Sequence, residues 1–232
     1  AGGPVLDALR WALDATLESV IPCARPGARA RADHLISTAC DLSGEYELGS
    51  LAEFYRAMLP KLYEFAAGEP VELETTRTTE LLRFNRSTAG LARFGLVDLF
   101  LRPETRTRAQ DAYNQAVRGS EIYTLDRFGS WAVPFDLVIP GKGRGTLRIA
   151  PKAVIVMTPV PQFITLKKPI ESVADLAEAI ERKFGTNCTL VGKAVSLIGM
   201  LASEFVFVFH EGASGYVPRC RAMHQHMIAA GL

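Results

Sequence analysis

The alternation of strand-like and helical patterns near the C-terminus constrains the fold more than any other feature. Apolar runs of strand length are separated by segments with helical spacing, and Ser172 stands where a helix N-cap is expected. The order is strand, helix, strand, helix, strand, at residues 152–158, 173–184, 188–191, 193–202 and 204–210. This order is typical of a βαβαβ unit with a parallel sheet. The sequence therefore predicts an α/β fold, with a mixed α+β fold as the alternative.

The N-terminal part of the chain, residues 1–69, carries helical patterns only. The segment 24–32, rich in Ala and Arg, is interpreted as a loop between two helices. A further helix is expected to begin after the capping residue Ser50 and to end at Gly68. We therefore expect a helical subdomain at 1–69 and an α/β domain at 70–232.

The middle of the chain mixes both kinds of pattern. Residues 71–76 alternate apolar and polar side chains as a half-buried strand does, whereas 103–117 has the spacing of a helix. Two β-rich runs, 131–139 and 146–157, are separated by the segment Pro140–Gly145. This pattern predicts a central β-hairpin with a long glycine-rich tip.

Composition excludes several classes of protein. Of the 232 residues, 48% are hydrophobic and 22% are charged, which argues against a disordered, collagen-like or coiled-coil chain. The four cysteines are far apart, and no apolar run reaches the roughly 18–20 residues that a membrane span needs. No secretory signal pattern is present at the N-terminus. We therefore expect a cytoplasmic protein that does not bind a membrane.

Polar residues follow each strand of the expected βαβαβ unit. Because the carboxyl ends of parallel strands meet at one edge, these residues would gather around one crevice. They are Thr158, Gly192, Lys193, His210, Glu211, Ser214 and Tyr216. An anionic, phosphorylated small molecule fits this set, with the Gly192 amide and Lys193 holding the anion. His210 and Glu211 would then transfer protons, although both residues could equally mark the point where a buried strand meets water.

The glycine-rich segment of the hairpin alternates glycines with cations. Lys142, Gly143 and Arg144 lie at its centre, and glycine lets a backbone approach a phosphate closely. We expect Lys142 and Arg144 to close over the anion. The alternative is a hairpin tip whose glycines only supply positive φ angles. Neither this segment nor Gly192–Lys193 has the spacing of a P-loop or a dinucleotide fingerprint.

The arginines of residues 77–127 raise an alternative function. Residues 70–170 contain 15 basic and 9 acidic side chains, so a basic face could bind nucleic acid or an acidic partner. The acids are interleaved with the arginines, however, and this interleaving is equally typical of a solvated surface of ion pairs.

The remaining motifs identify neither a metal site nor a family. Cys220, His224 and His226 have ligand chemistry, but on a helix His224 and His226 point about 200° apart, so no metal is expected. No motif identifies a cofactor or a known family. The chain opens on Ala1 rather than Met, so we also consider a non-catalytic domain of a larger protein, or an oligomer.

Overall fold

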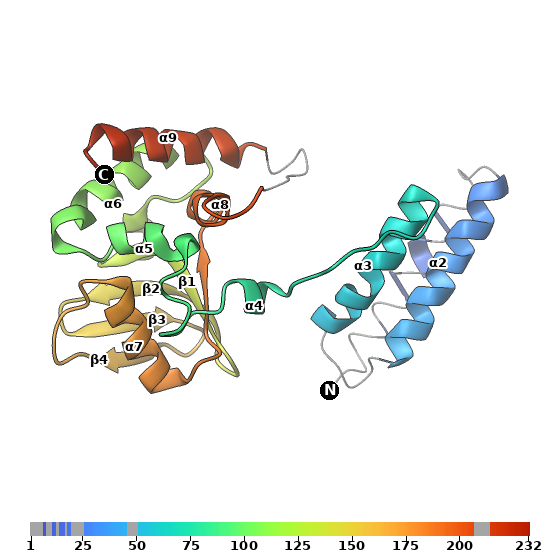
Figure 1. The fold of residues 1–232 in the computed structure, drawn as a ribbon, viewed down its shortest axis with the longest axis horizontal. Coiled ribbons are helices and arrows are strands. Elements are labelled where there is room, and N and C mark those ends of the chain that lie inside the picture. Colours follow the sequence, from blue (N-terminus) through green and yellow to red (C-terminus); the bar gives the residue numbers. More distant parts are fainter. Residues whose placement is uncertain are drawn as a thin grey trace. The chain divides into compact units, whose positions relative to one another are not determined.

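The computed structural model describes residues 26–45, 51–206 and 214–232, together with isolated positions between residues 7 and 19. The chain forms two compact units, Ala1–Arg77 and Thr78–Leu232 (Figure 1). The division falls at residue 77, whereas the sequence analysis placed it at residue 69.

The described residues of the first unit up to Ala67 are helical. Helix α2 (Pro26–Glu45) packs against α3 (Leu51–Ala67) around a small core of Ala39, Phe54 and Met58. The loop predicted for residues 24–32 is wrong from Pro26 onward, because this segment is the first turns of α2. Proline is well suited to a first helical position, and Ala and Arg are strong helix formers. Ser50 and most of the first predicted helix lie outside the described residues.

The strand predicted for residues 71–76 is not present. These residues follow α3 without regular secondary structure and pair with no strand of the described chain. Alternation of polar and apolar residues favours a strand only where a neighbouring strand accepts its backbone hydrogen bonds. The prediction failed because no strand among the described residues accepts these hydrogen bonds.

The second unit is built on one sheet of five strands in the order β4-β3-β2-β1-β5. Every neighbouring pair is antiparallel. The strands are β1 (Ala132–Ile139), β2 (Gly143–Ala150), β3 (Ala153–Met157), β4 (Gln162–Thr165) and β5 (Thr189–Gly192). The chain is therefore a mixed α/β protein, as expected from the sequence.

The predicted parallel βαβαβ unit is wrong. The run 146–157 is not one strand, because a turn at Pro151–Lys152 divides it into β2 and β3. Connections this short join antiparallel strands, so β1 to β4 form a meander. β5 then returns beside β1, which leaves β2 and β1 between β3 and β5. Of the third predicted strand, residues 204–206 are not in a strand, and 207–213 lie outside the described residues.

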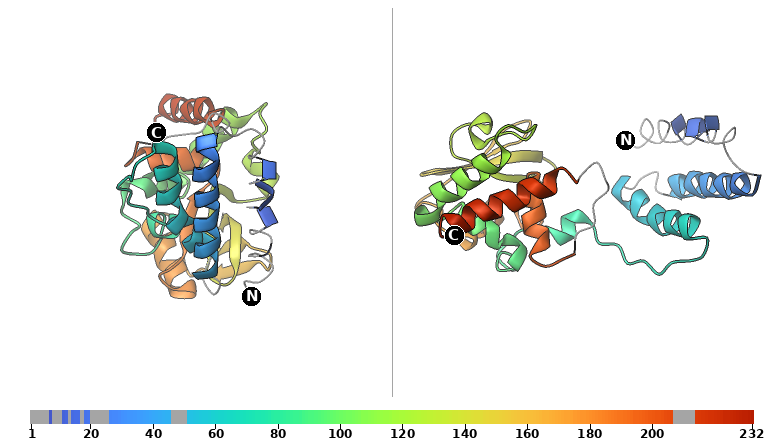
Figure 2. Two further views of the ribbon diagram at one scale, coloured as in Figure 1. Left: turned by 90° about the vertical axis from the view of Figure 1, so that its right-hand side faces the viewer. Right: turned by 90° about the horizontal axis from the view of Figure 1, so that it is seen from above.

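Helices of the second unit cover one face of the sheet (Figures 1 and 2). The helices predicted at 103–117 and 173–184 are confirmed, and the one predicted at 193–202 begins two residues later. The α-helices are α4 (Thr78–Leu81), α5 (Gly95–Leu99), α6 (Pro103–Val117), α7 (Val173–Phe184), α8 (Val195–Ala202) and α9 (Tyr216–Ala229), and the 3₁₀ turns are η2 (Ala92–Phe94) and η3 (Leu125–Phe128). None of the helices among the described residues has the length and apolarity needed to cross a membrane.

The two faces of the sheet differ in chemistry. One face contributes Phe135, Leu137, Leu147, Val154 and Val156 to the main core, where each is at most 1% exposed. Side chains alternate along a strand, so the intervening residues lie on the opposite face. We call this second face the open face, and its members include Asp136, Arg144, Thr146, Arg148, Ile155, Met157 and Phe163.

Candidate functional site

Asp136 brings two of the predicted ligand-binding residues together on the open face. Its carboxylate is only 9% exposed and accepts a hydrogen bond from Arg144 Nε at 2.8 Å. Lys193 forms an ion pair with the other carboxylate oxygen and is itself 14% exposed. Arg144 and Lys193 therefore converge on one carboxylate, so the anion between them belongs to the protein.

Arg148 lies further along β2 on the same face and has no such partner. Its guanidinium makes no hydrogen bond or ion pair with any other described residue, and its Nε is buried. The guanidinium packs instead against the backbone of Gly129, where a Cβ atom would lie 2.7 Å from Nη2. Gly129 also has a φ angle of 92°, which favours glycine. Arg148 is thus a half-buried cation without a counter-charge in the described chain.

The turn after η3 connects Arg148 with Lys193. The Lys193 ammonium lies 4.3 Å from the ring centre of Phe128, and Gly129, the next residue, contacts Arg148. Both cations therefore lie close to this turn. With Arg144 and Asp136, this set of residues carries three positive charges and one negative charge.

The Lys193 amide, which follows the Gly192 amide expected to bind an anion, is used within the protein. The Lys193 amide donates to the Pro134 carbonyl at 2.9 Å, and the Ser196 hydroxyl donates to the same carbonyl at 2.7 Å. Gly192 packs against the first turn of α8, where a Cβ would lie 2.3 Å from the Leu197 nitrogen. Gly192 is therefore explained by this close approach of β5 to α8.

The predicted long hairpin tip is wrong. A turn at residues 140–142 connects β1 to β2, and Gly143 already belongs to β2 with a φ angle of 96°. Lys142 donates to the Gln162 side chain at 2.8 Å and lies over the Phe184 ring at the end of α7. Lys142 thus contacts β4 and α7, whereas Arg144 faces Asp136. The two cations do not meet.

Thr158 and Lys193 do not share one edge of the sheet. Thr158 is buried, and its hydroxyl donates to the Val160 carbonyl at 2.7 Å. It follows β3, which runs opposite to β5, so Thr158 and Lys193 leave the sheet in opposite directions. Ser214 and Tyr216 are exposed at the start of α9. His210 and Glu211 lie outside the described residues.

Most arginines of residues 77–127 contact other parts of the protein. Arg86 pairs with Glu181 at 2.9 Å, and Arg93 pairs with Glu204 at 2.8 Å. Glu181 raises the pKa of Arg86 through its hydrogen bond and its charge. Others bind carboxylates, carbonyls or an aromatic ring: Arg77, Arg102, Arg106, Arg108 and Arg127. This arrangement favours ion pairs and carbonyl contacts within the protein over a surface for nucleic acid.

The two buried thiols among the described cysteines, Cys188 and Cys220, do not offer nucleophilic chemistry. Burial raises the pKa of the Cys188 thiol to about 11, and burial also raises the pKa of Cys220. Both thiols therefore stay protonated near neutral pH, where a nucleophile or a metal ligand would be a thiolate. Among the described residues, no three His, Cys, Asp or Glu side chains gather as a metal site requires.

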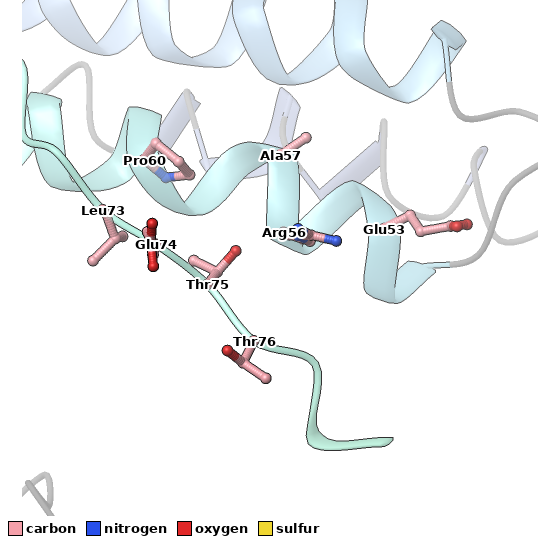
Figure 3. A pocket seen from close by; sticks show the side chains of 8 residues that line it. All are labelled: Glu53, Arg56, Ala57, Pro60, Leu73, Glu74, Thr75 and Thr76. Carbon is pink, nitrogen blue, oxygen red and sulfur yellow. The ribbon is translucent and has the colours of Figure 1, made fainter. Parts of the chain in front are cut away.

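A cavity of about 670 Å³ lies in the first unit, between α3 and the extended segment that follows it (Figure 3). Glu53 and Arg56 border it from α3, and Glu74 faces them from the extended segment. Its two carboxylates outnumber its one guanidinium, so its charge does not suit an anion. The site on the open face is therefore the stronger candidate.

Sequence reasoning missed Asp136, Gly129 and Arg148. Asp136 is an acidic residue within an apolar strand pattern, and a buried charge of this kind implies a partner. That signal was present in the sequence. Arg148 is different, because only the strand register reveals its contact with Gly129.

No protein-family model, curated protein or solved structure matches this chain.

Proposed function

We propose that this protein binds an anionic, phosphorylated small molecule on the open face, with Arg148 holding the phosphate. The observation that carries the proposal is the half-buried Arg148 guanidinium, which has no anionic partner in the described chain. Arginine stays charged at any physiological pH, and burying a charge without a counter-charge is costly. A bound phosphate would supply that counter-charge through two parallel hydrogen bonds.

The surroundings of Arg148 support an anion rather than a neutral ligand. The residues Arg144, Lys193, Arg148 and Asp136 together carry a charge of +2. Asp136 pairs with Lys193 and with the Nε of Arg144. Of the three cations, the guanidinium of Arg148 is therefore the one left to pair with a ligand. Gly129 has no side chain, which allows the Arg148 guanidinium to pack against its backbone at this turn. The proposal concerns binding, and it replaces the crevice of a parallel sheet with the open face of an antiparallel one.

Isothermal titration calorimetry with ribose 5-phosphate tests the proposal, with ribose as the matched ligand lacking a phosphate. We expect ribose 5-phosphate to bind and ribose not to bind. Arg148→Ala should weaken the binding about tenfold or more, because it removes a charge-assisted bidentate contact. Arg118→Ala is the control, since Arg118 is an exposed arginine at the end of α6. Equal losses in the two variants, or no binding to the unaltered protein, would reject the proposal.

A further inference from the structure

A cavity of about 320 Å³ lies between α6 and the turn that follows η3, and its lining includes Gly129, the residue that contacts the Arg148 guanidinium. The residues that line this cavity include Gln110, Asn114, Asp126, Ser130, Trp131 and Ala132. Ala132 is the direct cross-strand partner of Arg148, and the Trp131 carbonyl accepts a hydrogen bond from the next amide of β2, at Ile149. The cavity and Arg148 therefore share two neighbours, Gly129 and Ala132.

Trp131 presents an aromatic surface at this cavity. Its side chain is 54% exposed, although tryptophan is one of the most hydrophobic residues. Its φ angle is 61°, in the left-handed region that a bulky side chain rarely adopts. Such backbone strain persists where the surrounding structure enforces it, often at ligand sites. The exposed indole is a flat surface on which a planar ring can stack.

The polar groups of the cavity can form hydrogen bonds with the edge of such a ring. Asn114 Oδ1 accepts a hydrogen bond from the Leu125 amide at 2.8 Å, which leaves the Asn114 NH₂ group as a donor. Gln110 donates to the Ala132 carbonyl at 3.5 Å, which leaves its own side-chain carbonyl as an acceptor. Side-chain amides pair well with the donor and acceptor edge of a nucleobase.

From this arrangement we propose that the phosphorylated ligand is a nucleotide. Its base stacks on Trp131 with its polar edge toward Gln110 and Asn114, while Arg148 holds its phosphate. The inference rests on the proposed function, because it uses the same phosphate contact. Base stacking on an aromatic side chain is tolerant of the base, whereas the two amides discriminate between bases.

Titration of the full 232-residue chain with AMP, GMP, CMP and UMP tests the inference, with ribose 5-phosphate as the ligand lacking a base. We expect at least one nucleotide to bind about tenfold more tightly than ribose 5-phosphate. Trp131→Ala should remove this advantage and leave ribose 5-phosphate binding unchanged, and Trp131→Phe should keep most of it. Trp11→Phe is the control, since Trp11 is an exposed tryptophan of the first unit.

A second variant keeps the test valid if Trp131→Ala does not fold. Gln110→Ala should change the order of preference among the four nucleotides without changing ribose 5-phosphate binding. Nucleotide binding no tighter than ribose 5-phosphate would overturn the nucleotide inference while leaving the phosphate contact of Arg148 intact. Failure of every phosphorylated probe to bind would overturn both proposals.

Discussion

Asp136 is the acidic residue that holds two cations of the open face together. Its carboxylate is almost fully buried, so its charge needs compensation from within the protein. Arg144 supplies one cation from β2, and Lys193 supplies a second immediately after β5. The three residues therefore link the two strands that flank β1, in addition to the backbone ladder.

Replacing Lys193 by Ala should lower the free energy of unfolding by about 2 kcal/mol, because Asp136 would stay buried with only Arg144 as its partner. Urea denaturation at neutral pH measures the change. Lys152→Ala is the matched control, since Lys152 is exposed in the turn between β2 and β3, and it should change stability by less than about 0.5 kcal/mol. Equal stability of the two variants would contradict a structural role for the Lys193–Asp136 pair.

The chemical type of single residues was predictable from the sequence, but the residues that they contact were not. The sequence predicted Lys193 and Arg144 as cations that hold one ligand, whereas in the structure both contact the carboxylate of Asp136. It also attributed Gly192 to ligand binding, whereas a close backbone contact with α8 explains this glycine. Partners such as Asp136 depend on which strands are neighbours and in which register, and no local pattern in the sequence encodes that.

At the scale of elements, the N-terminus of α7 is stabilised by a short polar network. The Asp175 amide donates to the Ser172 hydroxyl at 3.1 Å, and this hydroxyl donates to the Asp175 carboxylate at 2.7 Å. Lys168 pairs with the same carboxylate at 2.7 Å. The hydrogen bonds from Lys168 and Ser172 hold the pKa of Asp175 below its ordinary value. A negative charge in the first turn also interacts favourably with the helix dipole.

Asp175→Asn should destabilise the protein by about 0.5–1 kcal/mol at pH 7, because it removes the charge that pairs with Lys168 and interacts with the helix dipole. Because the pKa of Asp175 is depressed in the folded state, its stabilising effect is present above the ordinary carboxyl pKa and is lost as the pH falls through the folded-state pKa. Urea denaturation at several pH values below 7 should therefore show the difference from the unaltered protein shrinking toward pH 3. Asp111→Asn, at an exposed position of α6, should show no such trend.

Elements with strong local signals were predictable, and strand direction was not. Pro103 at the start of α6, and Ser172 and Gly185 at the ends of α7, define both helices in the sequence and in the structure. The direction of β5 relative to β3 depends on whether the chain reverses between these two strands. Two strands joined by a helix usually run parallel. The strand directly before α7 is β4, however, and it runs opposite to β3, so β5 also runs opposite to β3. The short turns of the meander were the missed signal.

At the scale of the whole molecule, the candidate site belongs entirely to the second unit. Asp136, Arg148, Lys193 and Trp131 all lie within Thr78–Leu232, which has its own hydrophobic core. The first residues of this unit extend its sheet, because the Phe84 amide donates to the Cys188 carbonyl at 2.8 Å and the Leu190 amide donates to the Leu82 carbonyl at 3.0 Å. The chain before α5 thus protects the edge of β5.

A chain of residues 78–232 should therefore fold cooperatively and keep the affinity of the full chain for ribose 5-phosphate. A chain of residues 86–232 is the matched control, since it lacks Leu82 and Phe84, which are 1% and 0% exposed. Losing two fully buried side chains removes about 3–6 kcal/mol, comparable with the total stability of many domains, and it exposes the edge of β5. Thermal unfolding followed by circular dichroism should give a sharp transition for the longer chain only. If 78–232 failed to fold while the full chain folds, the second unit would depend on residues 1–77, and its core would not be sufficient for its stability.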